Sequence, residues 1–165
     1  MSKVSRSVEI SAPVGSVFNY YARPEHIAKT FPEDVKMKVT PIKVTEGFGI
    51  GTQFRIDGEF GGRPLAWDME TIAYRNNELI QVKAINGPFK KNIISVTFAP
   101  TSNGTHLTFE ADYELGYSLF GKAIDKLKLK KEVEMGIERS CVAVKKYIEA
   151  GKSTNEMVAE ISQAA

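Results

Sequence analysis

The sequence is short of the side chains that most often build metal sites and catalytic triads. Its 165 residues include one cysteine, Cys141, and two histidines, His26 and His106. A single cysteine excludes an internal disulfide and a zinc site built from a cysteine cluster. Neither histidine has a carboxylate or cysteine at ligand spacing, and the G-x-S-x-G pattern of a serine nucleophile is absent. We therefore expect no metal and no cofactor, a packed thiol at Cys141 and two surface histidines.

Concentrated charge and long apolar runs are also missing. The net charge of +2 is too small to indicate a phosphate-binding surface, so nucleic acid is not an expected partner. Only KLKLKKE, residues 126–132, is locally basic, and such a run is usually a solvated helix face. No stretch approaches the ~18 apolar residues that cross a bilayer, and the first residues lack the apolar segment of a secretion signal. A cytoplasmic location is the resulting expectation.

What the sequence does contain is a series of short segments in which apolar and polar residues alternate. Within residues 107–115, Leu107 and Phe109 point one way while Thr108 and Glu110 point the other. This period of two predicts a strand with one face in water. Six further strands are predicted, at residues 4–11, 36–45, 53–60, 65–70, 80–84 and 94–98. Their short connections require antiparallel neighbours, because a parallel crossover needs about a dozen residues or more.

Helical spacing replaces this alternation in two places. Residues 119–150 carry apolar side chains three and four positions apart, as in a helix that lies on a sheet, and Gly151 is a natural stop. In residues 11–32, Pro13 and Pro24 each suit the first turn of a short helix, so two short helices are predicted there.

The predicted architecture is a single α+β domain over residues 1–151. About seven antiparallel strands form a sheet with one apolar face, and the long helix covers that face. Residues 152–165 are predicted as a C-terminal tail with a short helix, because Ser153 and Glu156 have the spacing of a capping box.

Three stretches resemble a known superfamily. They are VEISAPVGSVFNYYARPEHI, GFGIGTQFRI, and ISVTFAPTSNGTHLTFEADYELG running into LFGKAIDKL and VKKYIEAG. Over residues 4–150 the chain resembles the helix-grip superfamily of birch-pollen-allergen-like, START-related and polyketide cyclase/dehydrase-like proteins (SRPBCC). The resemblance implies a curved sheet wrapped on the long helix, with a deep and mainly apolar cavity between them. Carriers, cyclases, lipid binders and allergens all belong to this superfamily.

Inward-facing aromatic residues are the predicted lining of this cavity. One helix cannot cover a strongly curved seven-stranded sheet without gaps, and small inward residues such as Gly58, Ala84 and Ala111 deepen the gap. The sheet would contribute Phe54, Phe60, Trp67, Phe98, Phe109 and Tyr113. The short helices would contribute Tyr20, Tyr21, Ile27 and Phe31, and the long helix Phe120, Ile124 and Leu127. The alternative is that the same aromatics simply form a filled core.

Polar residues at inward positions are a second feature. Lys130 and Glu134 fall inside the apolar stripe of the long helix, and Arg6 and Asn92 share the inward parity of their strands. A buried unpaired charge costs on the order of several kcal/mol, so these groups must be paired, wet or near an opening. Two interpretations stay open. Lys130 and Glu134 reach solvent where the helix bends near Gly136, or they form a polar wall that orients a ligand.

The glycines of EGFGIGTQF, residues 46–54, invite comparison with a phosphate-binding loop. The run leads into a predicted strand, with no helix start and no Lys-Ser/Thr pair after it. The nucleotide-binding motifs therefore do not apply, and the run predicts a hairpin loop next to the cavity mouth.

More than one class of function is compatible with these features. The first is a binding module for a small hydrophobic or aromatic molecule of lipid, quinone or polyketide-like character. The second is a polyketide cyclase/dehydrase-like enzyme, by analogy of fold, with Lys130, Glu134, Arg6, Tyr20 and Tyr113 as its polar groups. The third is an interaction protein acting through the charged run or the tail. The sequence does not decide whether the protein is an enzyme, and a homodimer is also left open.

Overall fold

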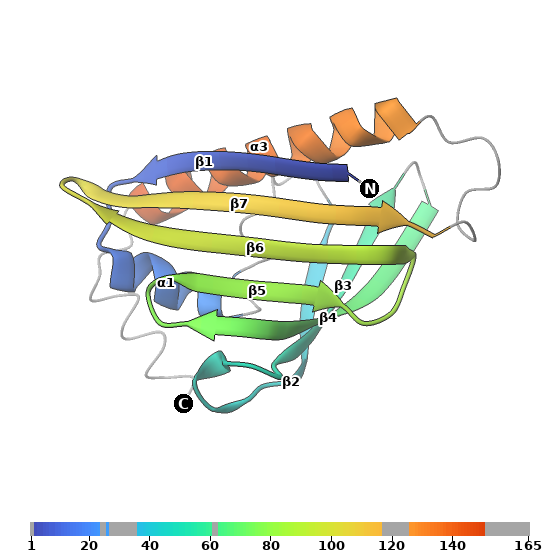
Figure 1. Ribbon diagram of the computed structural model, residues 1–165, viewed down its shortest axis with the longest axis horizontal. Helices are drawn as coiled ribbons and strands as arrows, with labels where there is room; N and C mark the ends of the chain where they lie inside the picture. Colours follow the sequence, from blue (N-terminus) through green and yellow to red (C-terminus); the bar gives the residue numbers. More distant parts are fainter. Residues whose placement is uncertain (1, 24–25, 27–35, 61–62, 117–125, 151–165) are drawn as a thin grey trace.

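The computed structural model of the chain is a curved antiparallel sheet with a long helix lying against it (Figure 1). It describes residues 2–23, 26, 36–60, 63–116 and 126–150. The strands are β1 (Ser2–Ile10), β2 (Lys38–Lys43), β3 (Gln53–Phe60), β4 (Arg63–Arg75), β5 (Leu79–Ala84), β6 (Phe89–Thr101) and β7 (Gly104–Leu115). The helices are α1 (Val14–Ala22) and α3 (Lys126–Glu149), and a 3₁₀ turn (Glu46–Phe48) lies in the loop between β2 and β3. The predicted α+β helix-grip architecture is confirmed.

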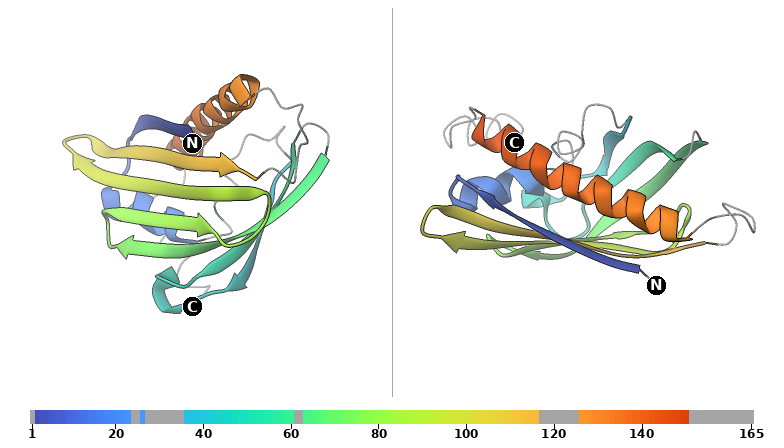
Figure 2. Two further views of the ribbon diagram at one scale, coloured as in Figure 1. Left: turned by 45° about the vertical axis from the view of Figure 1, so that its right-hand side comes forward. Right: turned by 90° about the horizontal axis from the view of Figure 1, so that it is seen from above.

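The seven strands follow the order β1-β7-β6-β5-β4-β3-β2. Strands β2 to β7 are paired in sequence order, and β1 completes the sheet beside β7, with Val4 opposite Ala111 and Val8 opposite Leu107. The register shifts between Thr71 and Ala73 in β4, where a bulge increases the local twist. Figure 2 shows β2 and β3 turned out of the plane of the other strands. The sheet therefore has a concave side, and α1 and α3 lie on it.

Buried apolar residues form three clusters on the concave side. The α1 cluster consists of Ile10, Val17, Phe18, Tyr20, Ile80, Val96, Phe98, Leu107, Val144 and Ile148. The α3 cluster consists of Val4, Ala111, Tyr113, Ile137 and Cys141. The β3 cluster consists of Phe54, Ile56 and Met69, with Met37 and Trp67 packed against it. The described core is therefore divided between the two helices and the turned-out strands.

Helix α1 begins directly after Pro13, whose carbonyl accepts hydrogen bonds from the amides of Ser16 (3.0 Å) and Val17 (3.1 Å). Its main anchor is Phe18, which meets the rings of Tyr74 and Phe98 edge-on at 5.2 and 5.1 Å between centroids. The predicted first short helix is thus present. Most of the predicted second one lies outside the described residues.

The surface prediction for His26 is wrong. This residue is 5% exposed, its ring stacks on Tyr20 at 4.4 Å, and its Nδ1 lies 3.0 Å from the Tyr20 carbonyl oxygen. Burial is tolerated because the ring has both an aromatic partner and a polar contact. His106 lies at the surface beside Glu9, as predicted.

Helix α3 is continuous through Gly136 from Lys126 to Glu149, so the bend considered at that glycine does not interrupt it. The predicted beginning of the helix, residues 119–125, lies outside the described residues. Its buried stripe includes Val144, Ile148 and Cys141, and burial raises the pKa of the Cys141 thiol. The prediction of a packed thiol is confirmed. No helix in the described part of the chain is long and apolar enough to cross a membrane.

A bidentate ion pair ties β3 to β4 on the convex side of the sheet. Arg55 donates from Nε to Oδ1 of Asp68 at 2.7 Å and from Nη2 to Oδ2 at 3.1 Å. Asn86, after β5, donates to the same carboxylate at 2.6 Å and accepts from the Asp68 amide at 2.7 Å. The bonds from Arg55 and Asn86 hold the pKa of Asp68 below its usual value. Three strands are thereby fixed at the place where the sheet turns.

We predict opposite effects of alanine at two glycines. A Cβ at Gly104, where φ is +153°, would lie 2.1 Å from the carbonyl oxygen of Ile10, so Gly104→Ala should destabilise the protein by more than about 2 kcal/mol. A Cβ at Gly136 meets no atom within 4 Å, so Gly136→Ala should stabilise α3 by about 0.5 to 1 kcal/mol. Urea unfolding of both variants measures the difference, and equal effects would contradict the described backbone.

The Asp68 carboxylate should contribute a stability that depends on pH. Because its folded pKa is depressed, the contribution is present above the unfolded value near about 4 and is lost as the pH falls through the folded pKa. Asp68→Asn should therefore lower the free energy of unfolding at neutral pH, and its deficit against the wild type should shrink on acidification. A deficit that stays constant down to the lowest folded pH would show that the ion pair contributes nothing.

Candidate functional site

The middle of the concave face is incompletely covered by the described residues. Ile94, on the interior strand β6, packs against all three clusters and is only partly buried. Val82 lies between the α1 and β3 clusters, and Val8 and Phe109 lie between the α1 and α3 clusters, all three also partly buried. Accessible surface at this position is unusual for apolar residues on the inner face of a sheet. A ligand could reach the sheet here.

Tyr21 on α1 packs beside the same region. It is one of the partly buried residues around the α1 cluster, and its ring meets that of Phe98 edge-on at 5.8 Å between centroids. Burial raises the pKa of its hydroxyl well above the usual value, with further contributions from Cys141 and Tyr20.

Three buried polar atoms have no hydrogen-bond partner among the described residues. They are the hydroxyls of Tyr20 and Tyr113 and the indole nitrogen of Trp67. Tyr20 belongs to the α1 cluster, Tyr113 to the α3 cluster, and Trp67 packs on the β3 cluster. Burial raises the pKa of both tyrosines, so each hydroxyl keeps its proton. Each part of the core thus contains one hydrogen-bond donor without an acceptor.

The pair Lys130 and Glu134 lies near one of these donors. Lys130 Nζ is 3.8 Å from Glu134 Oε1, and the two side chains are 47% and 30% exposed. The negative charge of Glu134 adds to the rise of the Tyr113 pKa that burial causes. The Ser2 hydroxyl offsets part of this rise, although it does not meet the geometry of a hydrogen bond to Tyr113. The pair is therefore partly solvated, and the charge of Glu134 acts on the buried Tyr113 hydroxyl.

Arg6 and Asn92 occupy the inward positions that the alternation predicts. Arg6 donates from Nη1 to the Ser5 carbonyl at 2.8 Å, and its charge partly offsets the rise of the Cys141 pKa. Asn92 is 8% exposed and lies opposite Tyr113 in the ladder between β6 and β7. Polar groups thus accompany the α3 cluster on both the β1 and the β6 side.

The residues predicted to line a cavity fall into four groups. Tyr20, Phe54, Phe98 and Tyr113 are buried, and Tyr21, Trp67 and Phe109 are partly buried on the concave side. Leu127 is 63% exposed, because it lies about 80° around α3 from the centre of the buried stripe. Ile27, Phe31, Phe120, Ile124 and the side chain of Phe60 lie outside what the structure describes.

Two of the small inward residues do not deepen a gap. Ala111 is covered by Ile137 and Cys141 within the α3 cluster. The space above Gly58 is taken by Met37, whose Cγ would lie 3.5 Å from an added Cβ, with the Trp67 ring at 3.9 Å. Met37 was not expected at the site, because its strand is an edge strand with irregular alternation.

An open cleft of about 410 Å³ lies beside Met37. Lys36, Met37 and Lys38 line it from β2 and the residues before it, and Asp57, Gly58 and Glu59 line it from β3. Met37 therefore both lines this cleft and packs against the β3 cluster. Within the described part of the chain, no three His, Cys, Asp or Glu side chains are grouped so that they could hold a metal ion.

Solved structures share this fold at low sequence identity. A START superfamily protein from Mycobacterium smegmatis is 20% identical, with 90% of this chain and 97% of that chain covered and a TM-score of 0.72. The ZhuI aromatase/cyclase from Streptomyces sp. R1128 is 16% identical, with 98% and 94% covered and a TM-score of 0.66. The ginseng major latex-like protein 151 from Panax ginseng is 19% identical, with 90% and 95% covered and a TM-score of 0.63.

Sequence comparison identifies the family of the chain. No curated protein matches the chain. Residues 1–149 match the family model described as polyketide cyclase / dehydrase and lipid transport. With the sheet and the long helix in the arrangement of the solved structures, the chain belongs to this family within the SRPBCC helix-grip superfamily.

Proposed function

We propose that the protein binds a small hydrophobic or aromatic molecule between the concave face of its sheet and α3. The observation that carries this proposal is the set of three buried donors without acceptors, on Tyr20, Trp67 and Tyr113. Leaving such a group unpaired costs about 1 to 3 kcal/mol. A ligand that supplies acceptors would remove this cost, which an apolar filling of the same space would not.

The chemistry of the donors constrains the ligand. The indole nitrogen of Trp67 can only donate, and the raised pKa values keep Tyr20 and Tyr113 protonated. The surrounding residues are apolar, among them Ile94, Val82 and Phe109. The ligand that fits best is an uncharged, mainly apolar frame that carries carbonyl or hydroxyl oxygens, such as a quinone, a polyketide-like compound or a neutral lipid.

The family supports the same class of ligand. Its description covers polyketide cyclases, dehydrases and lipid transport, and one of the solved structures with this fold is an aromatase/cyclase. The inward aromatic residues of this chain serve as an apolar surface for such molecules. The cytoplasmic location, the homodimer and the role of residues 152–165 stay predictions.

Removing one donor should weaken binding without harming the fold. An anthraquinone should bind the wild-type protein and quench the fluorescence of Trp67, the only tryptophan. Tyr113→Phe should weaken anthraquinone binding about three- to tenfold, because one hydrogen bond is lost. Its free energy of unfolding should be unchanged or slightly higher, because the hydroxyl has no partner in the free protein. Fluorescence titration and urea unfolding measure the two effects.

Anthracene is the matched probe, because it has the same ring frame without the oxygens. Tyr113→Phe should leave its affinity unchanged. The absence of binding by anthraquinone, anthracene and a neutral lipid such as a monoacylglycerol would contradict the proposal. Strong destabilisation by Tyr113→Phe would show that the hydroxyl has a partner within the protein.

A second candidate function is catalysis, favoured by the position of Glu134 near Tyr113. In the loss of water from a β-hydroxy ketone, the Glu134 carboxylate would remove the proton next to the carbonyl. The Tyr113 hydroxyl would donate a hydrogen bond to the carbonyl oxygen, and Lys130 would hold the carboxylate in place. The carbon–hydrogen bond breaks as Glu134 takes the proton, and the carbon–carbon double bond forms as the carbon–hydroxyl bond breaks. Glu134 returns that proton to the leaving hydroxyl, so water forms and the carboxylate is regenerated.

Glu134→Gln tests this candidate. It should reduce elimination from a bound β-hydroxy ketone by about a hundredfold or more, because positioned acid–base groups contribute that much. Glu138→Gln is the matched control, since Glu138 is an exposed glutamate on the same helix. Equal turnover by wild type and both variants, or no turnover at all, would leave ligand binding as the only function of the site.

A further inference from the structure

The loop between β2 and β3 exposes large aliphatic side chains at one extremity of the molecule (Figures 1 and 2). Ile42 is 51% exposed, Val44 is 48% exposed and Ile50 is 64% exposed. These three residues are called the hairpin tip below. Ile72 on β4 is 36% exposed and extends this surface. It is held beside the loop because the amide of Gly51 donates a hydrogen bond of 2.9 Å to the carbonyl oxygen of Thr71, the residue before Ile72.

The hairpin tip is held in an ordered conformation. The hydroxyls of Thr45 and Thr52 share a hydrogen bond of 2.8 Å across the loop, and the amide of Phe48 donates to the Thr45 carbonyl at 3.0 Å. The ring of Phe48 lies under the guanidinium of Arg23, 5.7 Å from its centroid. The aromatic residue of the loop is thus turned toward the protein, whereas Ile50 is turned toward solvent. The exposure of the aliphatic residues is a property of the fold.

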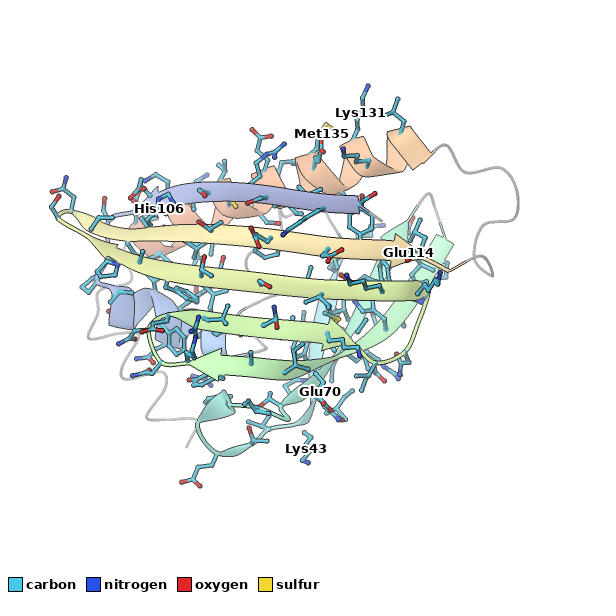
Figure 3. The ribbon with its side chains drawn as sticks, viewed as in Figure 1. Lys43, Glu70, His106, Glu114, Lys131 and Met135 are labelled. Atoms are coloured by element: carbon cyan, nitrogen blue, oxygen red, sulfur yellow. The ribbon has the colours of Figure 1, made fainter. Side chains whose placement is uncertain are left out.

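Positive charges accompany the hairpin tip. Lys36, Lys38 and Lys43 are exposed along this edge, and none of them has a hydrogen bond or an ion pair with another described residue. Lys43 lies beside the tip, and Lys36 and Lys38 lie at the other end of β2. The nearby acidic groups are Glu46 in the loop, Glu70, which accepts a hydrogen bond from Gln53 opposite Lys43, and Asp57 and Glu59 in the cleft. Figure 3 shows Lys43 at the end of the molecule opposite Met135 on α3. An aliphatic tip with free lysines is complementary to an anionic lipid surface.

We propose that the hairpin tip docks the protein on an anionic lipid bilayer. The proposal rests on the proposed function, because an apolar ligand partitions into membranes and must be collected there. A peptide strand fits the edge less well, since Pro41 lacks an amide proton and the register shifts between Pro41 and Lys43. A lipid bilayer accepts a protruding apolar tip without a groove of matching shape. A second copy of the chain would have to provide such a groove.

The cleft lies away from the hairpin tip on the same edge strand. Lys38, which lines the cleft, pairs with Asp57, whereas Lys43, beside the tip, pairs with Gln53. The cleft is therefore at the other end of β2, and the docking surface consists of the tip alone.

Vesicle binding tests the docking surface. Vesicles of phosphatidylcholine with about one third phosphatidylglycerol should cosediment with the wild-type protein, and the double variant Ile42→Ser/Ile50→Ser should bind more than about tenfold more weakly. The matched control is Met135→Ser/Val142→Ser, which removes aliphatic residues of similar exposure (57% and 61%) from α3. This control should bind like the wild type. Lys43→Glu should weaken binding to the anionic vesicles but not to pure phosphatidylcholine.

Three results would overturn the proposal. They are no cosedimentation of the wild type, equal losses in the tip and α3 variants, or a concentration-dependent dimer that the tip variant abolishes, which would assign the surface to a second copy. Anthraquinone binding in vesicle-free solution separates this test from the proposed function. The tip variant should keep that affinity, so a protein that binds anthraquinone but not vesicles contradicts only the docking.

Discussion

The architecture depends on one constraint: a single helix cannot bury the whole concave face of seven strands. Helix α3 covers the side of β1 and β7, and α1 covers the far end through Phe18. The turned-out strands β2 and β3 make a third core of their own, around Met69. Ile94 is left where the three clusters meet, and it is incompletely buried although it lies on an interior strand. The candidate site follows from this arrangement of the three clusters.

The same constraint explains why the polar groups of the interior matter. In a continuous core, a tyrosine hydroxyl without a partner would be replaced by phenylalanine at little cost. Here one such donor occurs in each part of the core, and the Lys130–Glu134 pair lies near one of them. The convex side is arranged differently. There the carboxylate of Asp68 is paired by Arg55 and Asn86, so the outer bonds fix the shape of the sheet, whereas the three inner donors have no partner among the described residues.

The alternation of the sequence was sufficient to predict the sheet, because each strand has one apolar and one polar face. It placed β3 to the residue and β5 to within one residue, and it shortened β4, β6 and β7, whose ends carry less regular patterns. The inward parity of Arg6 and Asn92 was also readable. The burial of His26 was not, since stacking on Tyr20 is a tertiary contact. The sequence also did not predict that Leu127 is exposed or that Met37 fills the space above Gly58. Both depend on how far each element reaches across the sheet.

The pairing of β1 with β7 has a consequence for biosynthesis. Ser2 lies opposite Tyr113, so the first strand of the sheet has no neighbour until its last strand has been synthesised. Contacts so distant along the chain form slowly, and an unpaired apolar strand is a target for aggregation meanwhile. The nascent chain should therefore depend on chaperones that shield the segment around Val4 and Val8 until β7 has left the ribosome.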